Sequence, residues 1–185
     1  MDKLIPVVVI KELGETEKIL SALKNDGINC AEITFRTACA ADAIALACKK
    51  FPDMNVGAGT VINAEQCEAA LKAGAKFIVS PGLSADVAKI CKQRGVPYYP
   101  GCVTPTEIMA ALDLGITTVK FFPANIYGGL KALKALSAPF PQIKFIPTGG
   151  VNSDNLEEFL SFEKVAAVGG SFMVEEALKK QKEEE

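Results

Sequence analysis

The sequence contains no histidine. This absence excludes Ser-His-Asp and Cys-His catalysis, and it disfavours the catalytic zinc and iron sites that depend on imidazole ligands. Acid–base chemistry must therefore fall to Glu, Asp, Lys, Tyr or Cys, or to water held by these side chains. We therefore expect no zinc or iron site of this kind.

Signals for export, membrane insertion and nucleic-acid binding are also missing. The first residues, Met1-Asp2-Lys3, carry no signal-peptide pattern, and no apolar run is long enough to span a bilayer. The net charge is -2 without a basic block, so neither nucleic acid nor a membrane is expected as a partner. None of the six cysteines forms a Cys-x-x-Cys pair. We expect a cytoplasmic protein with reduced, mostly buried thiols and without a disulfide framework or zinc site.

What the chain does contain is a regular alternation of two kinds of segment. Short apolar runs indicate buried strands over 4–10, 29–35, 54–60, 76–80, 96–99, 117–122, 143–147 and 165–168. Helical spacing, polar caps and terminal glycines indicate helices over 16–26, 38–50, 63–73, 84–94, 104–114, 129–136, 153–160 and 172–180. With 185 residues, 49% of them apolar, the chain has enough material for one domain with one core.

Eight strand–helix units predict the fold class. Repeated β-then-α units imply parallel strands with right-handed crossovers, and eight of them imply a single-domain (β/α)8 barrel. We expect the barrel to span 1–185, with 181–185 a frayed polar tail. The alternative, an open doubly wound sheet, fits less well because no Gly-x-Gly-x-x-Gly follows the first strand.

One predicted strand carries a charge among apolar neighbours. Lys120 lies between Val119 and Phe121, and Pro123 ends the run. Burial disfavours the charged form of an amine, and a neutral amine attacks ketones and aldehydes to form a Schiff base. The alternative is a lysine whose stem covers apolar surface while its ammonium group reaches water. Lys144, in another strand, precedes the apolar part and is expected to be structural or solvated.

Polar residues also gather where the strands end, which is the active-site face of such barrels. Alternation along the second strand predicts that Glu32, Thr34 and Arg36 point inward, with Ile33 and Phe35 outward. A carboxylate in an apolar interior is costly unless it is paired or used. It is either functional or half of a structural Glu32–Arg36 ion pair.

Glycine-rich ends mark other strands. Thr60 follows Gly57-Ala58-Gly59, where small residues permit a close approach of ligand or backbone. Thr148-Gly149-Gly150 and Gly169-Gly170-Ser171 end the seventh and eighth strands, where such barrels often hold a phosphate on backbone amides. Ser80-Pro81-Gly82 and Pro100-Gly101 are first interpreted as turns.

Taken together, six motifs resemble those of the 2-keto-3-deoxy-6-phosphogluconate (KDPG) and 2-keto-4-hydroxyglutarate (KHG) aldolase family. They are Glu32-Ile33-Thr34-Phe35-Arg36-Thr37, Gly57-Ala58-Gly59-Thr60, Ser80-Pro81-Gly82, Lys120-Phe121-Phe122-Pro123-Ala124, Pro147-Thr148-Gly149-Gly150 and Gly169-Gly170-Ser171. The resemblance covers nearly the whole chain. It implies a (β/α)8 barrel, a homotrimer and a place in the Entner–Doudoroff route of sugar-acid breakdown.

The resemblance also implies roles for particular residues. Lys120 would form the Schiff base, and Glu32 would be the general acid/base acting through water. The substrate-binding residues would be Arg36 and Thr60 at the pyruvyl carboxylate, Pro81 and Phe122 as walls of the pyruvyl pocket, and Thr148, Gly149, Gly150, Gly170 and Ser171 around the distal hydroxyls and phosphate. No metal ion and no other cofactor would take part.

The implied activity is class I aldol cleavage of a phosphorylated 2-keto acid, KDPG, to pyruvate and glyceraldehyde 3-phosphate. 4-Hydroxy-2-oxoglutarate would be a second substrate, giving pyruvate and glyoxylate. The motifs do not choose between phosphogluconate-, phosphogalactonate- and hydroxyglutarate-type keto acids. Thr148 resembles the residue at the corresponding position of the phosphogluconate-type enzymes.

Two alternatives stay open. The chain could be a catalytically impaired barrel that acts as a phosphate-binding or structural subunit of a trimer. Family members usually have a helix before the first strand and a longer C-terminal helical region, and we expect that difference to affect stability and assembly rather than chemistry. The other alternative is a phosphosugar isomerase or epimerase, which needs a catalytic base but no buried lysine.

Overall fold

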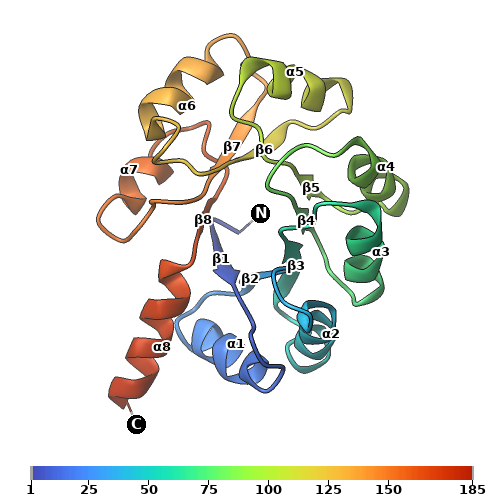
Figure 1. Ribbon diagram of the computed structural model, residues 1–185. Helices are drawn as coiled ribbons and strands as arrows, with labels where there is room; N and C mark the ends of the chain where they lie inside the picture. Colours follow the sequence, from blue (N-terminus) through green and yellow to red (C-terminus); the bar gives the residue numbers. More distant parts are fainter. Residues whose placement is uncertain (1, 185) are drawn as a thin grey trace.

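The computed structural model describes residues 2–184 and contains eight strands and eight helices in strict alternation (Figure 1). Their bounds are β1 (Leu4–Val8), α1 (Glu15–Asn25), β2 (Cys30–Thr34), α2 (Ala40–Lys50), β3 (Asn55–Gly59), α3 (Ala64–Lys72), β4 (Ile78–Val79), α4 (Ala85–Arg94), β5 (Tyr98–Tyr99), α5 (Pro105–Asp113), β6 (Thr118–Phe121), α6 (Gly129–Ser137), β7 (Lys144–Pro147), α7 (Leu156–Leu160), β8 (Val168–Gly170) and α8 (Phe172–Glu184). The predicted order of elements is confirmed.

All the paired strands are parallel, as the alternation predicts. Six strands form one sheet in the order β5-β4-β3-β2-β1-β8, and β6 pairs with β7 in a second. Isolated bridges link the two sheets, from Gly101 to Lys120 on one side and from Thr148 to Gly169 on the other. Figure 1 shows the strands at the centre and the helices around them. The strand ends that carry the glycine-rich motifs therefore face one another.

Several helix ends follow from their capping residues. The side chains of Asn63 and Ser84 accept hydrogen bonds from backbone N–H groups in the first turns of α3 and α4. Thr104 and Glu107 form a capping box at the start of α5. Gly95 ends α4 in the left-handed conformation, with φ of 66°. These local signals fix where the helices begin and end.

The helix predicted over 153–160 is wrong at its start, because α7 begins only at Leu156. The Oδ1 of Asn152 accepts hydrogen bonds from the backbone N–H groups of Asp154 (3.0 Å) and Asn155 (3.2 Å). These bonds close a turn over 152–155, and α7 follows it, with the N–H of Leu156 donating to the carbonyl of Asn152 at 3.0 Å.

The last strand and the last helix also differ from expectation. β8 begins at Val168, where pairing with Leu4 starts, whereas Val165 makes only an isolated bridge to Phe145. The apolar run from Val165 indicates which residues are buried, but regular strand pairing with β1 begins only at Val168. α8 continues beyond residue 180 to Glu184, with Lys179 and Glu183 4.0 Å apart as an i,i+4 pair. Fraying of 181–185 stays a prediction, and Glu185 lies outside the described residues.

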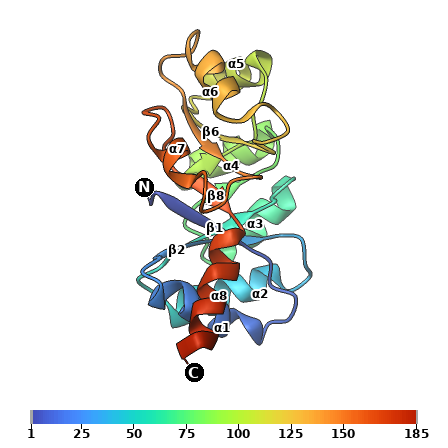
Figure 2. The same cartoon turned by 90° about the vertical axis from the view of Figure 1, so that its left-hand side faces the viewer.

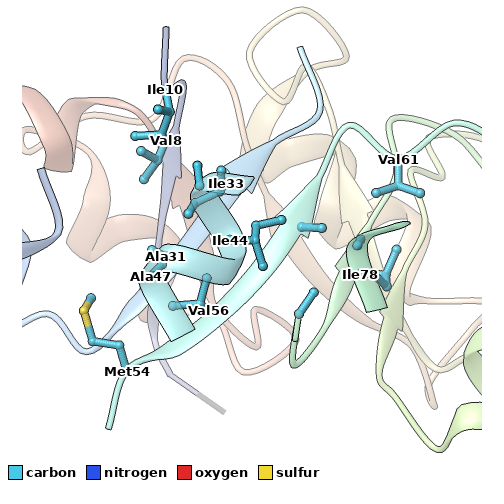
Figure 3. Close-up of a cluster of buried hydrophobic side chains, with 14 of the residues drawn as sticks. Val8, Ile10, Ala31, Ile33, Ile44, Ala47, Met54, Val56, Val61 and Ile78 are labelled. Atoms are coloured by element: carbon cyan, nitrogen blue, oxygen red, sulfur yellow. The ribbon is translucent and has the colours of Figure 1, made fainter. Parts of the chain in front are cut away.

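The apolar core forms between helices and strands, and a smaller cluster fills the space among the strands. Figure 3 shows the first of these, with Ile44 and Ala47 of α2 packed against Ile33 of β2 and Val56 of β3. The inner cluster consists of Ile5, Cys30, Phe77, Val79, Ile146 and Ala167. α8 packs against α1 and β1 (Figure 2). Among the described residues, no helix is long and apolar enough to cross a membrane.

Candidate active site

The centre of the site is a buried ion pair between two distant strands. The Nζ of Lys120, on β6, donates to Oε1 of Glu32, on β2, at 3.3 Å. The exposed fractions are 4% for Lys120 and 2% for Glu32. The alternative of a solvent-reaching Lys120 is therefore wrong. In the described part of the chain, Glu32 is paired with Lys120 and has no ion pair with Arg36.

The local sequence explains how a lysine comes to be buried here. Val119 and Phe121, on either side of Lys120, belong to the apolar core, so alternation directs Lys120 to the opposite face of β6. Its backbone N–H donates to the carbonyl of Pro100, and its carbonyl accepts from the N–H of Cys102. The ring of Phe122 lies 5.3 Å from Nζ, within the range of a cation–π contact. Lys144 is exposed at the start of β7, as expected.

Gly59 makes room for the Glu32 carboxylate. A Cβ atom at Gly59 would lie 2.7 Å from Cδ of Glu32, closer than nonbonded atoms approach. The sequence predicts that small residues at the end of β3 let a ligand or backbone come close. In the structure, the group that comes close to Gly59 is the Glu32 side chain. Gly57 similarly faces the ring of Phe77.

A second polar contact lies beyond the end of β2. The Nε of Arg36 donates to Oγ1 of Thr60 at 3.1 Å, and Arg36 is exposed. Thr60 has φ of 56°, in the left-handed region where a β-branched residue is strained. Strain of this kind clusters at binding sites, and here it directs the hydroxyl toward the guanidinium.

A cavity of about 150 Å³ opens beside this contact. Its lining is Val7, Val9, Arg36, Phe122, Thr148, Gly149, Gly150, Val151, Gly170 and Ser171. Gly149 and Gly150 have φ of 90° and 74°, which favours glycine at both. A Cβ atom at Gly169 would clash with Oγ1 of Thr148, so a residue without a side chain is needed there to leave room for that hydroxyl.

The electrostatic character of the cavity suits an anion. Arg36 is the only charged side chain among the described residues that line it. The helix α8 begins directly after Ser171, so the positive end of its dipole lies at the cavity. The hydroxyl group of Ser171 adds a neutral donor, whereas that of Thr148 donates to the carbonyl of Ile146 at 3.4 Å. The arrangement can hold an acid between Arg36 and the start of α8.

Larger cavities lie elsewhere, and two of them contain no ion pair between the described residues that line them. One of about 310 Å³ is lined by parts of α4, β5 and the segment before β6, and another of about 260 Å³ is lined by Asp2, Phe77 and Tyr99 among others. The second contains Cys30, whose pKa is raised to about 12 by burial and by nearby Asp2. A thiol held protonated is a poor nucleophile.

The structure brings together ten of the eleven residues selected from the sequence. Pro81 is exposed, contacts the Gly101 backbone and does not line the cavity. Sequence reasoning missed Val7, Val9 and Val151 as lining residues, because an apolar side chain carries no chemical signal of a site. It also missed the cis peptide bond between Phe122 and Pro123.

Comparison with known proteins gives a consistent family. The family model for KDPG and KHG aldolase matches residues 1–185. A 2-dehydro-3-deoxy-phosphogluconate aldolase of Treponema pallidum is 44% identical over 172 residues, which are 93% of this chain and 82% of that protein. A KHG/KDPG aldolase of Escherichia coli is 41% identical over 170 residues, 92% of this chain and 80% of that protein.

A solved structure is also similar over its whole fold. The KDPG aldolase of Legionella pneumophila, crystallised with pyruvate captured at low pH as a covalent carbinolamine intermediate, is 44% identical with a TM-score of 0.91. The match covers 97% of this chain and 88% of that one. Sequence, fold and site motifs agree, and the chain belongs to the KDPG and KHG aldolase family.

Proposed function

We propose that this chain is a class I aldolase that cleaves KDPG to pyruvate and glyceraldehyde 3-phosphate. The observation that carries the proposal is the buried Lys120 in contact with the buried Glu32 at 3.3 Å. A buried amine beside a carboxylate provides a nucleophile and a proton carrier in one place. The related proteins that are named as KDPG and KHG/KDPG aldolases support the substrate.

The first half of the reaction builds an electron sink. Lys120 passes a proton to Glu32, 3.3 Å away, and its Nζ then forms a bond to C2 of the keto acid. The electron pair of the C=O bond moves to oxygen, which takes that proton from Glu32. Glu32 next removes a proton from the nitrogen and returns it to the hydroxyl group, which leaves as water, and an iminium ion remains. The captured carbinolamine of the Legionella enzyme is chemistry of this type in a related protein.

The second half breaks the carbon–carbon bond. Glu32, through a water molecule, takes the proton of the C4 hydroxyl group, and the C3–C4 electron pair moves into the iminium to give an enamine. Glyceraldehyde 3-phosphate leaves. The enamine is protonated at C3, and water then releases pyruvate and restores Lys120. Each step is a proton transfer or the making or breaking of a bond at carbon, with the iminium ion as electron sink, so the proposed mechanism uses no metal ion.

The keto acid would lie along the groove that these residues define. Arg36 and Thr60, joined at 3.1 Å, would bind the pyruvyl carboxylate beside Lys120, with Phe122 as a wall. The distal hydroxyls and phosphate would lie in the 150 Å³ cavity against Thr148, Gly149, Gly150, Gly170 and Ser171. Pro81 as a second wall of the pyruvyl pocket stays a prediction.

The wider assembly is part of the proposal. We take the two sheets to be one closed (β/α)8 barrel and one domain, which the bridges Gly101–Lys120 and Thr148–Gly169 support. The homotrimer and the cytoplasmic location stay predictions. Sedimentation equilibrium of the purified protein tests the trimer.

A coupled assay tests the function. Pyruvate released from KDPG is followed by its reduction with lactate dehydrogenase and NADH, with and without EDTA. We expect cleavage that EDTA does not change, no cleavage by Lys120→Met, and a loss of about 10²–10⁴-fold for Glu32→Gln. A folded protein that releases no pyruvate but binds phosphate would support the impaired-subunit alternative. Pyruvate release at the wild-type rate by Lys120→Met would contradict the Schiff-base mechanism. Isomerisation of a phosphosugar without pyruvate release, retained in Lys120→Met, would support the isomerase alternative.

A further inference from the structure

Thr34 carries a buried hydroxyl that the proposed mechanism does not use. Its exposed fraction is 0%, and its Oγ1 forms no hydrogen bond with any described residue. A buried polar atom without a partner costs about 1–3 kcal/mol, and each such atom in a native protein calls for an explanation. Valine has nearly the same shape and would avoid that cost, so the hydroxyl group itself needs a reason.

The strand register places the Thr34 side chain on the same face of β2 as Glu32 and opposite Gly59. Thr34 and Glu32 are two residues apart on β2, so their side chains share one face. Thr34 pairs with Gly59 on β3, and the space above Gly59 is where the Glu32 carboxylate lies. Neighbouring strands are about 4.8 Å apart. Rotation about the Cα–Cβ bond of Thr34 can therefore bring its hydroxyl within hydrogen-bonding distance of that carboxylate.

We propose that Thr34 is a positioning residue whose hydroxyl donates to the Glu32 carboxylate once Nζ of Lys120 is bonded to the substrate. This inference rests on the proposed aldolase function. In the structure, Lys120 supplies the hydrogen bond to Oε1 of Glu32. When Nζ bonds to C2 and Glu32 turns to the substrate oxygens, the carboxylate loses that donor. Inside a low-dielectric site an ionised carboxylate needs another hydrogen-bond donor in place of Lys120. The Thr34 hydroxyl, which has no other partner among the described residues, can be that donor.

Thr34→Val removes the hydroxyl and keeps the shape, and Thr16→Val is its matched control. Thr16 is also fully buried and its hydroxyl also lacks a described partner, but it lies on α1, outside the strand interior. We expect Thr34→Val to lower kcat for KDPG cleavage about 10- to 100-fold with KM changed less than threefold, as for a lost hydrogen bond to a charged group. Thr34→Ser should recover most of kcat, and Thr16→Val should leave it unchanged.

A double-mutant cycle tests whether Thr34 acts through Glu32. In the Glu32→Gln background we expect Thr34→Val to cost less than threefold, because the carboxylate that it serves is gone. An undiminished loss in that background, or a Thr34→Val kcat within twofold of Thr16→Val, would overturn the inference. Thr34→Ala gives the same comparison if the valine variant fails to fold.

The wild-type protein separates failure of this inference from failure of the proposed function. If it cleaves KDPG while Thr34→Val keeps full kcat, only the role of Thr34 is wrong. If the folded wild type cleaves no keto acid, the proposed function fails and the inference fails with it.

Discussion

Nζ of Lys120 lies 3.3 Å from Oε1 of Glu32, although the two residues are 88 positions apart in the chain. Both side chains are almost completely buried. Each group therefore depends on the other for its place in the interior, because an isolated charge there would be strongly disfavoured. The same pair that is proposed to do the chemistry is also a structural element.

Removing one member of this pair should destabilise the fold. Lys120→Met leaves the Glu32 carboxylate buried without its cation, and we expect the free energy of unfolding to fall by about 3–5 kcal/mol. Urea denaturation followed by circular dichroism measures this. The double variant Lys120→Met/Glu32→Leu should recover most of the loss, since apolar replacement of a buried pair is often neutral or stabilising. Equal stability of the single variant and the wild type would show that the pair is solvated in solution.

Gly59→Ala should reduce catalysis by moving Glu32. The new methyl group would lie in the space of the carboxylate, 2.7 Å from its Cδ, so the side chain must shift. A shift of about 1 Å in a catalytic group can cost on the order of 100-fold in rate. We expect kcat for KDPG cleavage to fall by that order. Gly14→Ala is the control, because its φ is −63° and a Cβ there meets nothing within 4 Å.

The distal cavity should distinguish phosphorylated from unphosphorylated substrates. Ser171→Ala removes a hydroxyl at the start of α8. A hydrogen bond to a charged group contributes about 1.5–3 kcal/mol, so KM for KDPG should rise about tenfold or more. KM for 4-hydroxy-2-oxoglutarate should change little. An equal rise in KM for both substrates would show that Ser171 does not bind the phosphate. Ser153→Ala serves as the control, because Ser153 lies on the exposed loop before α7.

Alkaline pH should destabilise the fold through buried thiols. Burial raises the pKa of both Cys30 and Cys102 to about 12 from an ordinary value of 9.0. The folded state therefore keeps these protons where the unfolded state has lost them. Their contribution is fully present below pH 9, and each thiol loses about 1.4 kcal/mol per pH unit as the pH rises from 9 toward 12.

Urea denaturation at pH 8 and pH 10.5 measures this slope. Cys102→Ala should make it shallower by the share of one thiol. A slope that is identical in Cys102→Ala and the wild type would contradict the assignment.

The order of elements could be predicted because strand and helix signals are local. Alternating patterns and caps such as Thr104 with Glu107 predict where each unit lies. The bounds were less predictable. Strand β8 begins where Val168 can pair with Leu4, and Leu4 lies at the other end of the chain. The side chain of Asn152 closes a turn over 152–155 before α7, which the spacing of apolar residues does not report.

The candidate site was predictable as a set of residues and less so as an arrangement. Alternation along β2 placed Glu32 and Thr34 in the interior, and both are buried. The partner of Glu32 was not predictable, because it comes from β6 and depends on how distant strands face one another. The left-handed backbone of Thr60 and the fit of Glu32 over Gly59 likewise arise only in the assembled fold.

Borohydride trapping is the most direct test of whether Lys120 forms a Schiff base. The protein is mixed with pyruvate and sodium borohydride, and its peptides are mapped by mass spectrometry. We expect one adduct in the wild-type protein, a carboxyethyl group on Lys120. The same adduct should form more slowly in Glu32→Gln and should be absent in Lys120→Met. A folded wild-type protein with no adduct on Lys120, or with the adduct on another lysine, would contradict this role of Lys120.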